Sequence, residues 1–348
     1  MEPREHGAPS GHRGALEITA AELAGSPAWF PLEAPGGELL RLVRLDEAAY
    51  RQASFLDQRI LAALPEEGVC PIATATAAAG MLPMRAHYIF HIGHVGSTLI
   101  SRLLGEHPGF HSVREPALLR ALAAAPAQAA HAPSLTVTLA LLARTWRAQQ
   151  RALIKATSFV SEIAGSILAT DDQAAALLVF TPPLAYLRCI LGGPNSRLES
   201  RALAPARLTR LHARIGSAAL PSLPGSEGEW IAMSWLCEMS ALCQAATPCE
   251  ARVRWIDFDE FLAMPAAGLT EALRALGAAP AAHDVDKLLA GPWMGRYAKA
   301  PEHAYDAALR RSVLEAADQE HRSEIRRGMD WLARAAGRHR LIDAALAH

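Results

Sequence analysis

The chain has 348 residues, of which 51% are hydrophobic and 20% charged, which is enough ordinary globular sequence for one large or two small domains. Its 34 lysines and arginines nearly balance its 35 aspartates and glutamates. The bulk charge therefore predicts neither nucleic acid nor an anionic membrane as a partner. A binding site for an anion would have to be local.

The five cysteines are odd in number and include no Cys-x-x-Cys pair, which favours free thiols in a reducing cytoplasm over disulfides or zinc. The N-terminus lacks the apolar core of a signal peptide, and no run of 18 uncharged apolar residues follows. These patterns predict a soluble, cytoplasmic protein.

Residues 1–86 predict an N-terminal elaboration of a larger domain. A polar tail over residues 1–15 precedes a strand at 38–45 and a helical pattern from Glu47 to Ala63. The segment GVCPIATATAAAG, residues 68–80, is interpreted as a connection.

Residues 87–348 alternate short apolar runs with helical patterns, which predicts an α/β domain with a parallel sheet covered by helices on both faces. The expected strands are 88–92, 110–113, 152–156, 176–181 and 252–258. The expected helices begin at Ser97, Val160 and Leu184 or lie at 117–128, 135–149 and 228–246. A helical tail with a break near Gly328 follows from Glu302.

The segment GHVGST, residues 93–98, joins the first of these strands to a helix. Glycines permit a tight turn whose N–H groups converge at the positive end of the helix, which predicts an anion cradle. The full Walker pattern is absent because His91 stands where its first glycine belongs and Gly96 is followed by Ser97 in place of the lysine. The alternative interpretation is a structural turn in which Ser97 and Thr98 only cap the helix.

Together with HPGFHSVREP at residues 107–116, this loop resembles the sulfotransferase family, in particular bacterial members with a GxSGST loop. The resemblance implies a P-loop α/β fold, a 3′-phosphoadenylyl sulfate donor and no metal. It assigns the donor's 5′-phosphosulfate to the loop, with His94 at the position of the family's basic residue. The residues so assigned are Gly93, His94, Val95, Gly96, Ser97 and Thr98.

Glu115 and Lys155 follow the second and third expected strands, on the side where ligands bind in such sheets. By resemblance, Glu115 would be the general base, and Lys155, with His94, would offset charge at the leaving group. The alternatives are a salt bridge between Glu115 and Arg114, a helix N-terminal charge, and a solvated loop lysine.

The fourth strand departs from the family pattern. Thr181 and Cys189 stand where the family has an arginine and a serine that hold the donor's 3′-phosphate. We expect Arg188, or Arg197 and Arg201, to replace them.

A glycine-rich, aromatic and basic segment at residues 291–303 is a second candidate for the nucleotide, with a surface connection as its alternative. Arg296 and Lys299 would contact phosphate, and Trp293 or Tyr297 would stack on the base. The turn GGPNSR, residues 192–197, would line the acceptor side.

The leading hypothesis is sulfuryl transfer to a hydroxyl or amine of a small molecule. A kinase-like enzyme using ATP and Mg²⁺ is the second, with Asp257 or Asp259 as the metal ligand. A non-catalytic nucleotide-binding or interaction protein is the third. The sequence specifies neither the acceptor nor the oligomeric state.

Overall fold

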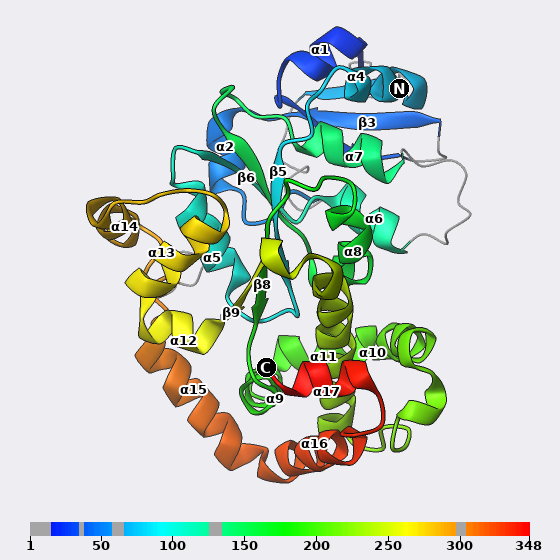
Figure 1. Cartoon of the computed structure of the whole chain (residues 1–348), viewed down its shortest axis with the longest axis vertical. Helices are drawn as coiled ribbons and strands as arrows, with labels where there is room; N and C mark the ends of the chain where they lie inside the picture. The colour runs from blue at the N-terminus through cyan, green and yellow to red at the C-terminus, as the bar shows by residue number, and fades with distance from the viewer. Residues whose placement is uncertain (1–14, 35–37, 58–65, 125–133, 297–303) are drawn as a thin grey trace, which may run out of the picture.

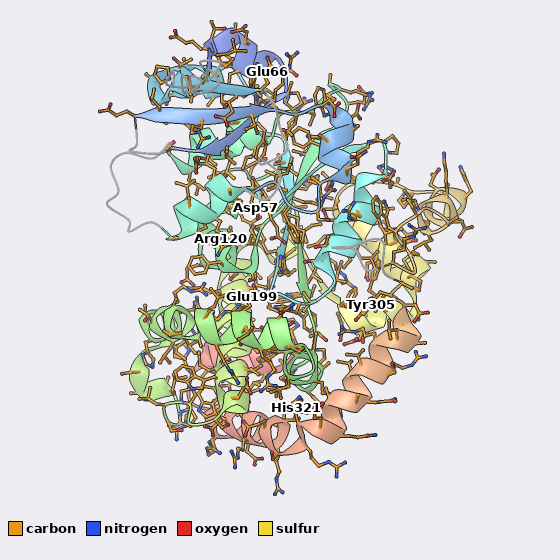
Figure 2. All side chains as sticks on the ribbon, turned by 180° about the vertical axis from the view of Figure 1, so that it is seen from behind. Asp57, Glu66, Arg120, Glu199, Tyr305 and His321 are labelled. Atoms are coloured by element: carbon orange, nitrogen blue, oxygen red, sulfur yellow. The ribbon has the colours of Figure 1, made fainter. Side chains whose placement is uncertain are left out.

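The computed structural model describes residues 15–34, 38–57, 66–124, 134–296 and 304–348. Two sheets organise this part of the chain, a small one at the N-terminal end and a larger central one (Figure 1). Figure 2, drawn from behind, places Glu66 beside the small sheet and His321 at the far end of the molecule. None of the described helices is long and apolar enough to cross a membrane.

The small sheet has the order β1-β4-β3-β2, with β1 parallel to β4 and the other pairs antiparallel. Its strands are β1 (Leu16–Glu17), β2 (Trp29–Glu33), β3 (Leu39–Arg44) and β4 (Glu67–Pro71). The helices that follow its strands along the chain are α1 (Ala20–Gly25), α2 (Glu47–Gln52) and α4 (Ile72–Gly80).

The strand expected at 38–45 is confirmed as β3. The helix expected from Glu47 to Ala63 begins at Glu47 as α2 but ends at Gln52, so its predicted extension over residues 53–57 is wrong. Residues 58–63 of that helical pattern lie outside the described residues. The interpretation of residues 68–80 as a connection is wrong, because they form the end of β4 and then α4. Small apolar residues allow this: Ala75 and Ala78 are fully buried in a separate core that α7 (Leu135–Leu142) helps to cover.

The central sheet confirms the predicted α/β class. Five strands run parallel in the order β6-β7-β5-β8-β9. They are β5 (Ala86–His91), β6 (Phe110–Arg114), β7 (Arg151–Lys155), β8 (Ala176–Phe180) and β9 (Val253–Asp257), each within a residue or two of the expected run.

Helices cover both faces of this sheet. On one face lie α5 (Ser97–Gly105), α13 (Pro265–Ala275) and α14 (Ala282–Leu289). On the other lie the 3₁₀ helix η2 (Ser158–Ile163), α8 (Ala164–Leu168) and α11 (Glu227–Ala246). The remaining connections contain α6 (Ala117–Ala124), α7 (Leu135–Leu142), α9 (Pro183–Leu191), α10 (Pro194–Ile215), η3 (Ser217–Ala219), η4 (Thr247–Arg252) and α12 (Phe258–Ala263).

The C-terminal tail is helical, as predicted, and consists of α15 (Ala307–Glu320), α16 (Arg322–Ala335) and α17 (Arg340–Leu346). Its break lies at His321 and not near Gly328, which is inside α16. A Cβ at Gly328 would lie 2.6 Å from the carbonyl oxygen of Gly228 in α11. Gly328 therefore marks a close helix crossing, where any side chain would push α16 away from α11.

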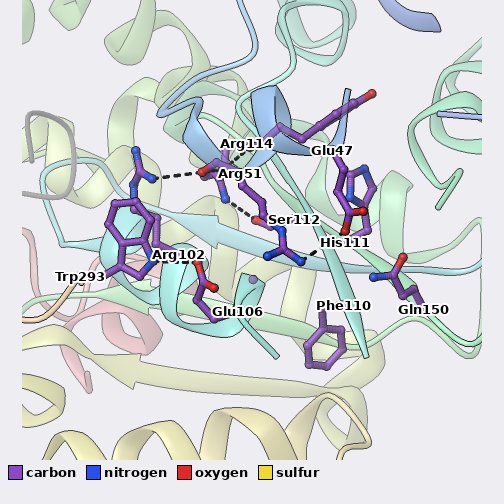
Figure 3. A pocket seen from close by; sticks show the side chains of 12 residues that line it. Glu47, Arg51, Arg102, Glu106, Phe110, His111, Ser112, Arg114, Gln150 and Trp293 are labelled. Atoms are coloured by element: carbon purple, nitrogen blue, oxygen red, sulfur yellow. Dashed lines mark hydrogen bonds and ion pairs between the residues drawn. The ribbon is translucent and has the colours of Figure 1, made fainter. Parts of the chain in front are cut away.

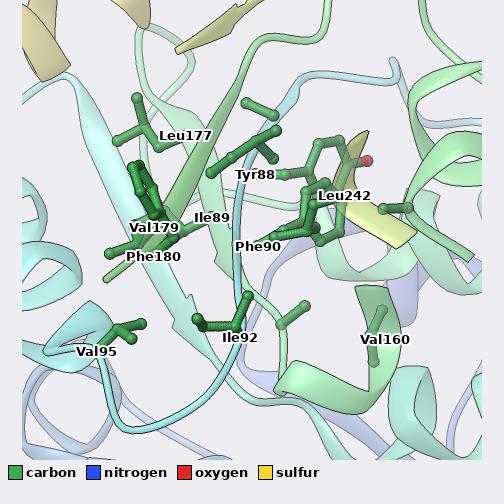
Figure 4. Packing of buried hydrophobic residues seen from close by; sticks show 14 of the residues in the cluster. Tyr88, Ile89, Phe90, Ile92, Val95, Val160, Leu177, Val179, Phe180 and Leu242 are labelled. Carbon is green, nitrogen blue, oxygen red and sulfur yellow. The ribbon is translucent and has the colours of Figure 1, made fainter. Parts of the chain in front are cut away.

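The core under the central sheet is closely packed up to the ends of the strands. Tyr88 and Phe90 of β5 stack with ring centroids 5.6 Å apart, and Figure 4 shows them beside Leu242 of α11. Ile92 and Val95, in the connection after β5, are also fully buried. This packing makes the start of the following loop a fixed part of the fold.

Two buried arginines fasten α2 to the central sheet. Arg114 of β6 donates from Nε to the carbonyl of Ala53 at 2.7 Å and from Nη2 to that of Arg51 at 3.0 Å. Arg102 of α5 donates to the carbonyl of Arg51 at 3.3 Å (Figure 3) and to that of Gln52 at 3.1 Å. The guanidiniums thus satisfy the free carbonyls and the negative end of α2. Arg114 is not the partner of Glu115.

Two buried histidines predict acid sensitivity. Burial lowers the pKa of His87 from 6.5 to about 4 and that of His111 to about 3, so both stay neutral in the fold while the unfolded chain takes up protons. Stability therefore falls as the pH drops from 6.5, by about 2 kcal/mol per histidine at pH 5. Urea denaturation from pH 7 to 5 measures this. His87→Gln should remove about half of the slope, and an unchanged slope would refute the assignment.

Candidate functional site

The glycine loop, residues 93–98, leaves β5 through three residues with positive φ: Gly93 at 87°, His94 at 57° and Gly96 at 63°. At Gly96 space also matters, since an added Cβ would lie 1.9 Å from the Phe258 ring. Positive φ at His94 is unusual for a non-glycine residue, and such strain is common where a loop is shaped for a ligand.

The N–H groups of the loop are available to a ligand. The backbone N–H of Gly93 donates to Nδ1 of His91 at 3.0 Å, whereas the backbone N–H groups of residues 94–98 donate no hydrogen bond within the described chain. Thr98 is 2% exposed, and its hydroxyl has no partner there either. Five consecutive unpaired N–H groups and a buried hydroxyl at a helix N-terminus have the geometry of an anion cradle.

A cavity of about 180 Å³, here called the loop cavity, opens on this cradle. Its lining also includes Arg296, Tyr305 and Arg310. It is lined by His91, His94, Val95, Gly96, Ser97, Thr98, Leu99, Cys189, Ser196, Phe258, Arg296, Tyr305 and Arg310. The loop cavity therefore joins two of the segments singled out in the sequence, the glycine loop and the start of the segment at 291–303.

Arg310 is a site residue that the sequence did not indicate. From α15 it donates Nε to Oδ1 of Asp259 at 2.6 Å, and Thr181 donates its hydroxyl to Oδ2 at 2.6 Å. Burial alone would raise the pKa of Asp259, but the hydrogen bonds from Arg310 and Thr181 outweigh it and lower the pKa. Asp259 thus stays ionised at neutral pH and holds Arg310 at the cavity wall.

The arginines expected to replace the family's 3′-phosphate ligands, an arginine and a serine, do not line the loop cavity. Arg188 donates from Nη2 to Asp318 at 2.8 Å, and Arg197 and Arg201 both pair with Glu227. None of the three lines the loop cavity. Cys189 does line it, with its thiol 3.7 Å from the carbonyl oxygen of His94.

The described residues of the segment at 291–303 lie in two different environments. Arg296 lines the loop cavity, but Trp293 lies under the guanidinium of Arg102 at 4.0 Å and donates to Glu106 at 3.0 Å (Figure 3). Tyr297 and Lys299 lie outside the described residues.

A second cavity, here called the strand-end cavity, lies beyond the carboxyl ends of β6 and β7 and measures about 270 Å³. His91 and His94 line both cavities. The lining is completed by Phe55, Asp57, Gly93, Glu115, Arg120, Thr157, Ser158, Phe159, Tyr186, Ile190, Glu199, Ser200, Leu203 and Arg207. Figure 2 shows Asp57, Arg120 and Glu199 on one side of the molecule, well apart from Tyr305.

The structure brings Glu115 and Lys155 together. Register pairs Arg114 with Lys155, so Glu115 follows β6 at the point where β7 ends, and its N–H donates to the carbonyl of Lys155 at 2.6 Å. The Lys155 ammonium forms a salt bridge with the Glu115 carboxylate. Lys155 is fully buried and lines neither cavity, so its interpretation as a solvated loop lysine is wrong.

The turn predicted at residues 192–197 is limited to Gly192 and Gly193, because Pro194 begins the 22-residue helix α10. Ser196 and Glu199 in its first turns contact His94: Ser196 Oγ lies 3.3 Å from Nδ1, and Glu199 Oε2 lies 3.4 Å from Nε2. Neither contact could be read from the sequence, since it depends on where α10 crosses the loop.

No group of three or more His, Cys, Asp or Glu among the described residues is arranged to hold a metal ion. Asp257 accepts a hydrogen bond from the N–H of Asp259 at 2.8 Å and caps α12. All five cysteines are free thiols.

No family model and no curated protein matches the chain. Similar solved structures include the sulfotransferase domain from the curacin biosynthetic pathway, at 14% identity and a TM-score of 0.42, covering 72% of this chain and 98% of that one. The sulfotransferase domain of the Synechococcus PCC 7002 olefin synthase has 14% identity and a TM-score of 0.39, covering 71% and 94%. Sulfotransferase STF9 from Mycobacterium avium has 11% identity and a TM-score of 0.39, covering 70% and 78%. Likeness at this level decides neither the family nor the activity of this chain.

Proposed function

We propose that the protein transfers a sulfuryl group from 3′-phosphoadenylyl sulfate to a hydroxyl or amine of a small molecule. The observation that carries this proposal is the position of the glycine loop between two cavities that share His91 and His94. Group transfer needs such an arrangement, because donor and acceptor must meet at one point from separate sites. The free thiols fit the cytoplasmic location proposed from the sequence.

The loop cavity would take the donor. The unpaired N–H groups of residues 94–98 and the hydroxyl of Thr98 would bind the oxygens of the 5′-phosphate. Arg296 and Arg310, which also line this cavity, would bind the nucleotide's other phosphate, in place of the strand-end arginine that Thr181 replaces. Lys299 remains a proposal from the sequence, and Arg188, which pairs with Asp318, could replace the missing phosphate ligands only by leaving that partner.

The strand-end cavity would take the acceptor. Glu115 lines it and would accept the acceptor's proton as the acceptor oxygen or nitrogen bonds to sulfur. The bond from sulfur to the bridging oxygen breaks at the same time, and its electron pair remains on the released 5′-phosphate of adenosine 3′,5′-bisphosphate. Lys155 would hold the Glu115 carboxylate in place, and its predicted action on the leaving group would require it to leave that salt bridge.

The kinase-like alternative draws no support from its proposed metal ligands. Asp259 is engaged by Arg310 and Thr181, and Asp257 caps α12, so binding Mg²⁺ would require both to exchange these partners. The non-catalytic alternative keeps its original support, the Thr181 and Cys189 replacements.

A transfer assay tests the proposal. The protein is incubated with 3′-phosphoadenylyl sulfate and a panel of phenols, alcohols and amines, and both adenosine 3′,5′-bisphosphate and sulfated product are measured. Glu115→Gln should slow turnover about 10²–10⁴-fold while bisphosphate affinity is retained. Equal turnover by Glu115→Gln and wild type would contradict the role of Glu115. Consumption of ATP with Mg²⁺, and not of the sulfate donor, would favour the kinase-like alternative.

A further inference from the structure

Arg207 is a buried cation in the lining of the strand-end cavity. Its side chain is 5% exposed, and from α10 its Nε donates to Oε1 of Glu238 in α11 at 3.0 Å. Its Nη1 and Nη2 groups donate no hydrogen bond within the described residues. A guanidinium remains protonated in proteins and only donates hydrogen bonds. The two Nη groups therefore leave a charged edge of donors for a ligand in this cavity.

The charge of Arg207 is only partly compensated. Oε1 of Glu238 also accepts from Arg210 at 3.0 Å, and Arg210 and Arg214 both pair with Glu162. This cluster holds three guanidiniums and two carboxylates, which gives it a net charge of +1. Arg207 is the member of the cluster that lines the strand-end cavity. Because buried charges are normally compensated, one bound monoanion would complete the balance.

Two hydroxyls in the same lining, those of Thr157 and Tyr186, are buried and have no hydrogen-bond partner in the described chain. Burial raises the pKa of the Tyr186 phenol, and the positive charge of Arg207 opposes this rise, so the two side chains lie close together and the hydroxyl keeps its proton. Buried polar groups normally have partners. Unpaired hydroxyls beside a buried guanidinium therefore indicate a polar site that a ligand completes.

The other charged residues of the lining do not cancel this positive charge. Glu115 is neutralised by its salt bridge with a buried lysine. Asp57 and Arg120 contribute one charge of each sign. The side chain of Glu199 is 58% exposed, so water screens its repulsion of an anion. Arg207 is therefore the buried charge that an anion in this cavity would meet.

We infer that Arg207 is a specificity-determining residue that binds a carboxylate of the acceptor. The acceptor is then a small molecule with a carboxylate in addition to the hydroxyl or amine that receives the sulfuryl group. The inference rests on the sulfuryl-transfer function proposed above. Nη1 and Nη2 can each donate to one oxygen of the same carboxylate, and a monoanion matches the net charge of the cluster. This contact would fix one end of the acceptor while its reacting group faces Glu115, which lines the same cavity.

The test compares phenols that carry a carboxylate with their neutral amides. The probes are 4-hydroxybenzoate, 4-hydroxyphenylacetate and 3-(4-hydroxyphenyl)propionate, whose different lengths allow for the distance between Glu115 and Arg207. Binding to the full chain is measured by calorimetry at pH 7, and sulfate transfer is measured separately with 3′-phosphoadenylyl sulfate. At least one carboxylate should bind about tenfold more tightly than its amide and show the same ratio in KM. Arg207→Gln should abolish this preference and leave the affinity for the amides unchanged.

Arg210→Gln is the matched control, because Arg210 pairs with the same Glu238 but does not line the cavity. It should lower stability and keep the preference for carboxylates. Tyr186→Phe removes only the hydroxyl without a partner, so it should weaken carboxylate binding and leave amide binding unchanged.

Equal affinities of wild type for carboxylates and amides would overturn the inference, and this comparison stands whether or not a variant folds. Loss of the preference in Arg210→Gln as well as in Arg207→Gln would also overturn it, because the effect would then come from the cluster and not from contact. The proposed function fails separately: a carboxylate preference in binding without sulfate transfer to any probe would contradict that function and support the anion site. Transfer to carboxylates and amides at equal KM would support the function and contradict the anion site.

Discussion

Replacing Lys155 by methionine is expected to lower the free energy of unfolding by about 3–5 kcal/mol. Lys155 has no exposed surface, and the side chain of its partner Glu115 is 11% exposed. Methionine fills a similar volume but leaves the carboxylate with too little water to replace the ammonium. Chemical denaturation at pH 7 measures the loss.

A double-mutant cycle separates the ion pair from simple packing. Glu115→Gln alone should also lower the free energy of unfolding, because it leaves the fully buried Lys155 ammonium without this carboxylate. Combining the two should recover part of the Lys155→Met loss, since no uncompensated carboxylate remains. A loss below about 1 kcal/mol for Lys155→Met would show that water reaches the carboxylate, and would contradict the buried pair.

Gly96→Ala is expected to disrupt the loop more than any other single methyl group added to it. The new Cβ would lie 1.9 Å from the Phe258 ring, which is itself 2% exposed and cannot easily move. The left-handed backbone adds strain of about 1 kcal/mol, and overpacking adds about 1–3 kcal/mol. We expect a loss of about 2–4 kcal/mol by chemical denaturation and at least a tenfold loss of bisphosphate affinity.

Gly277→Ala is the matched control, because Gly277 also has a positive φ, of 76°, but nothing lies within 4 Å of its added Cβ. Gly277→Ala should lower the free energy of unfolding by the backbone strain alone and leave the affinity for the bisphosphate unchanged. Phe258→Leu should restore part of the stability of Gly96→Ala by making room for the methyl group. Equal effects at Gly96 and Gly277 would show that the Phe258 contact adds nothing.

The central strands and the glycine loop could be predicted because their signals are local. An apolar run followed by GHVGST specifies a strand, a turn with positive φ and a helix start within about a dozen residues. The position of Glu115 could also be predicted from local signals, because Pro116 ends its strand and adjacent parallel strands end at one edge of the sheet.

The contacts between distant segments could not be predicted. Arg310 reaches the loop cavity from a helix 51 residues beyond its partner Asp259, and nothing in an amphipathic helical pattern distinguishes it from its neighbour Arg311. Glu199 was missed for a local reason, because glycine and proline before it were interpreted as a turn and not as the start of α10.

The prediction that residues 68–80 form a connection was wrong for a third reason. Their many alanines carry little periodic contrast between apolar and polar positions, so β4 and α4 left no clear pattern. Pairing with β3 and burial of Ala75 and Ala78 stabilise these elements, and both depend on the assembled fold.

The most direct test of the account is the affinity of the glycine loop for adenosine 3′,5′-bisphosphate, measured by calorimetry on wild type and Thr98→Val. Valine keeps the shape of threonine but lacks the hydroxyl that has no partner in the described chain. We predict that wild type binds the bisphosphate without Mg²⁺, and that Thr98→Val binds it about tenfold more weakly with no loss of stability. Absence of binding to wild type, or equal binding by Thr98→Val together with a loss of stability, would contradict the assignment of the loop as the donor's phosphate site.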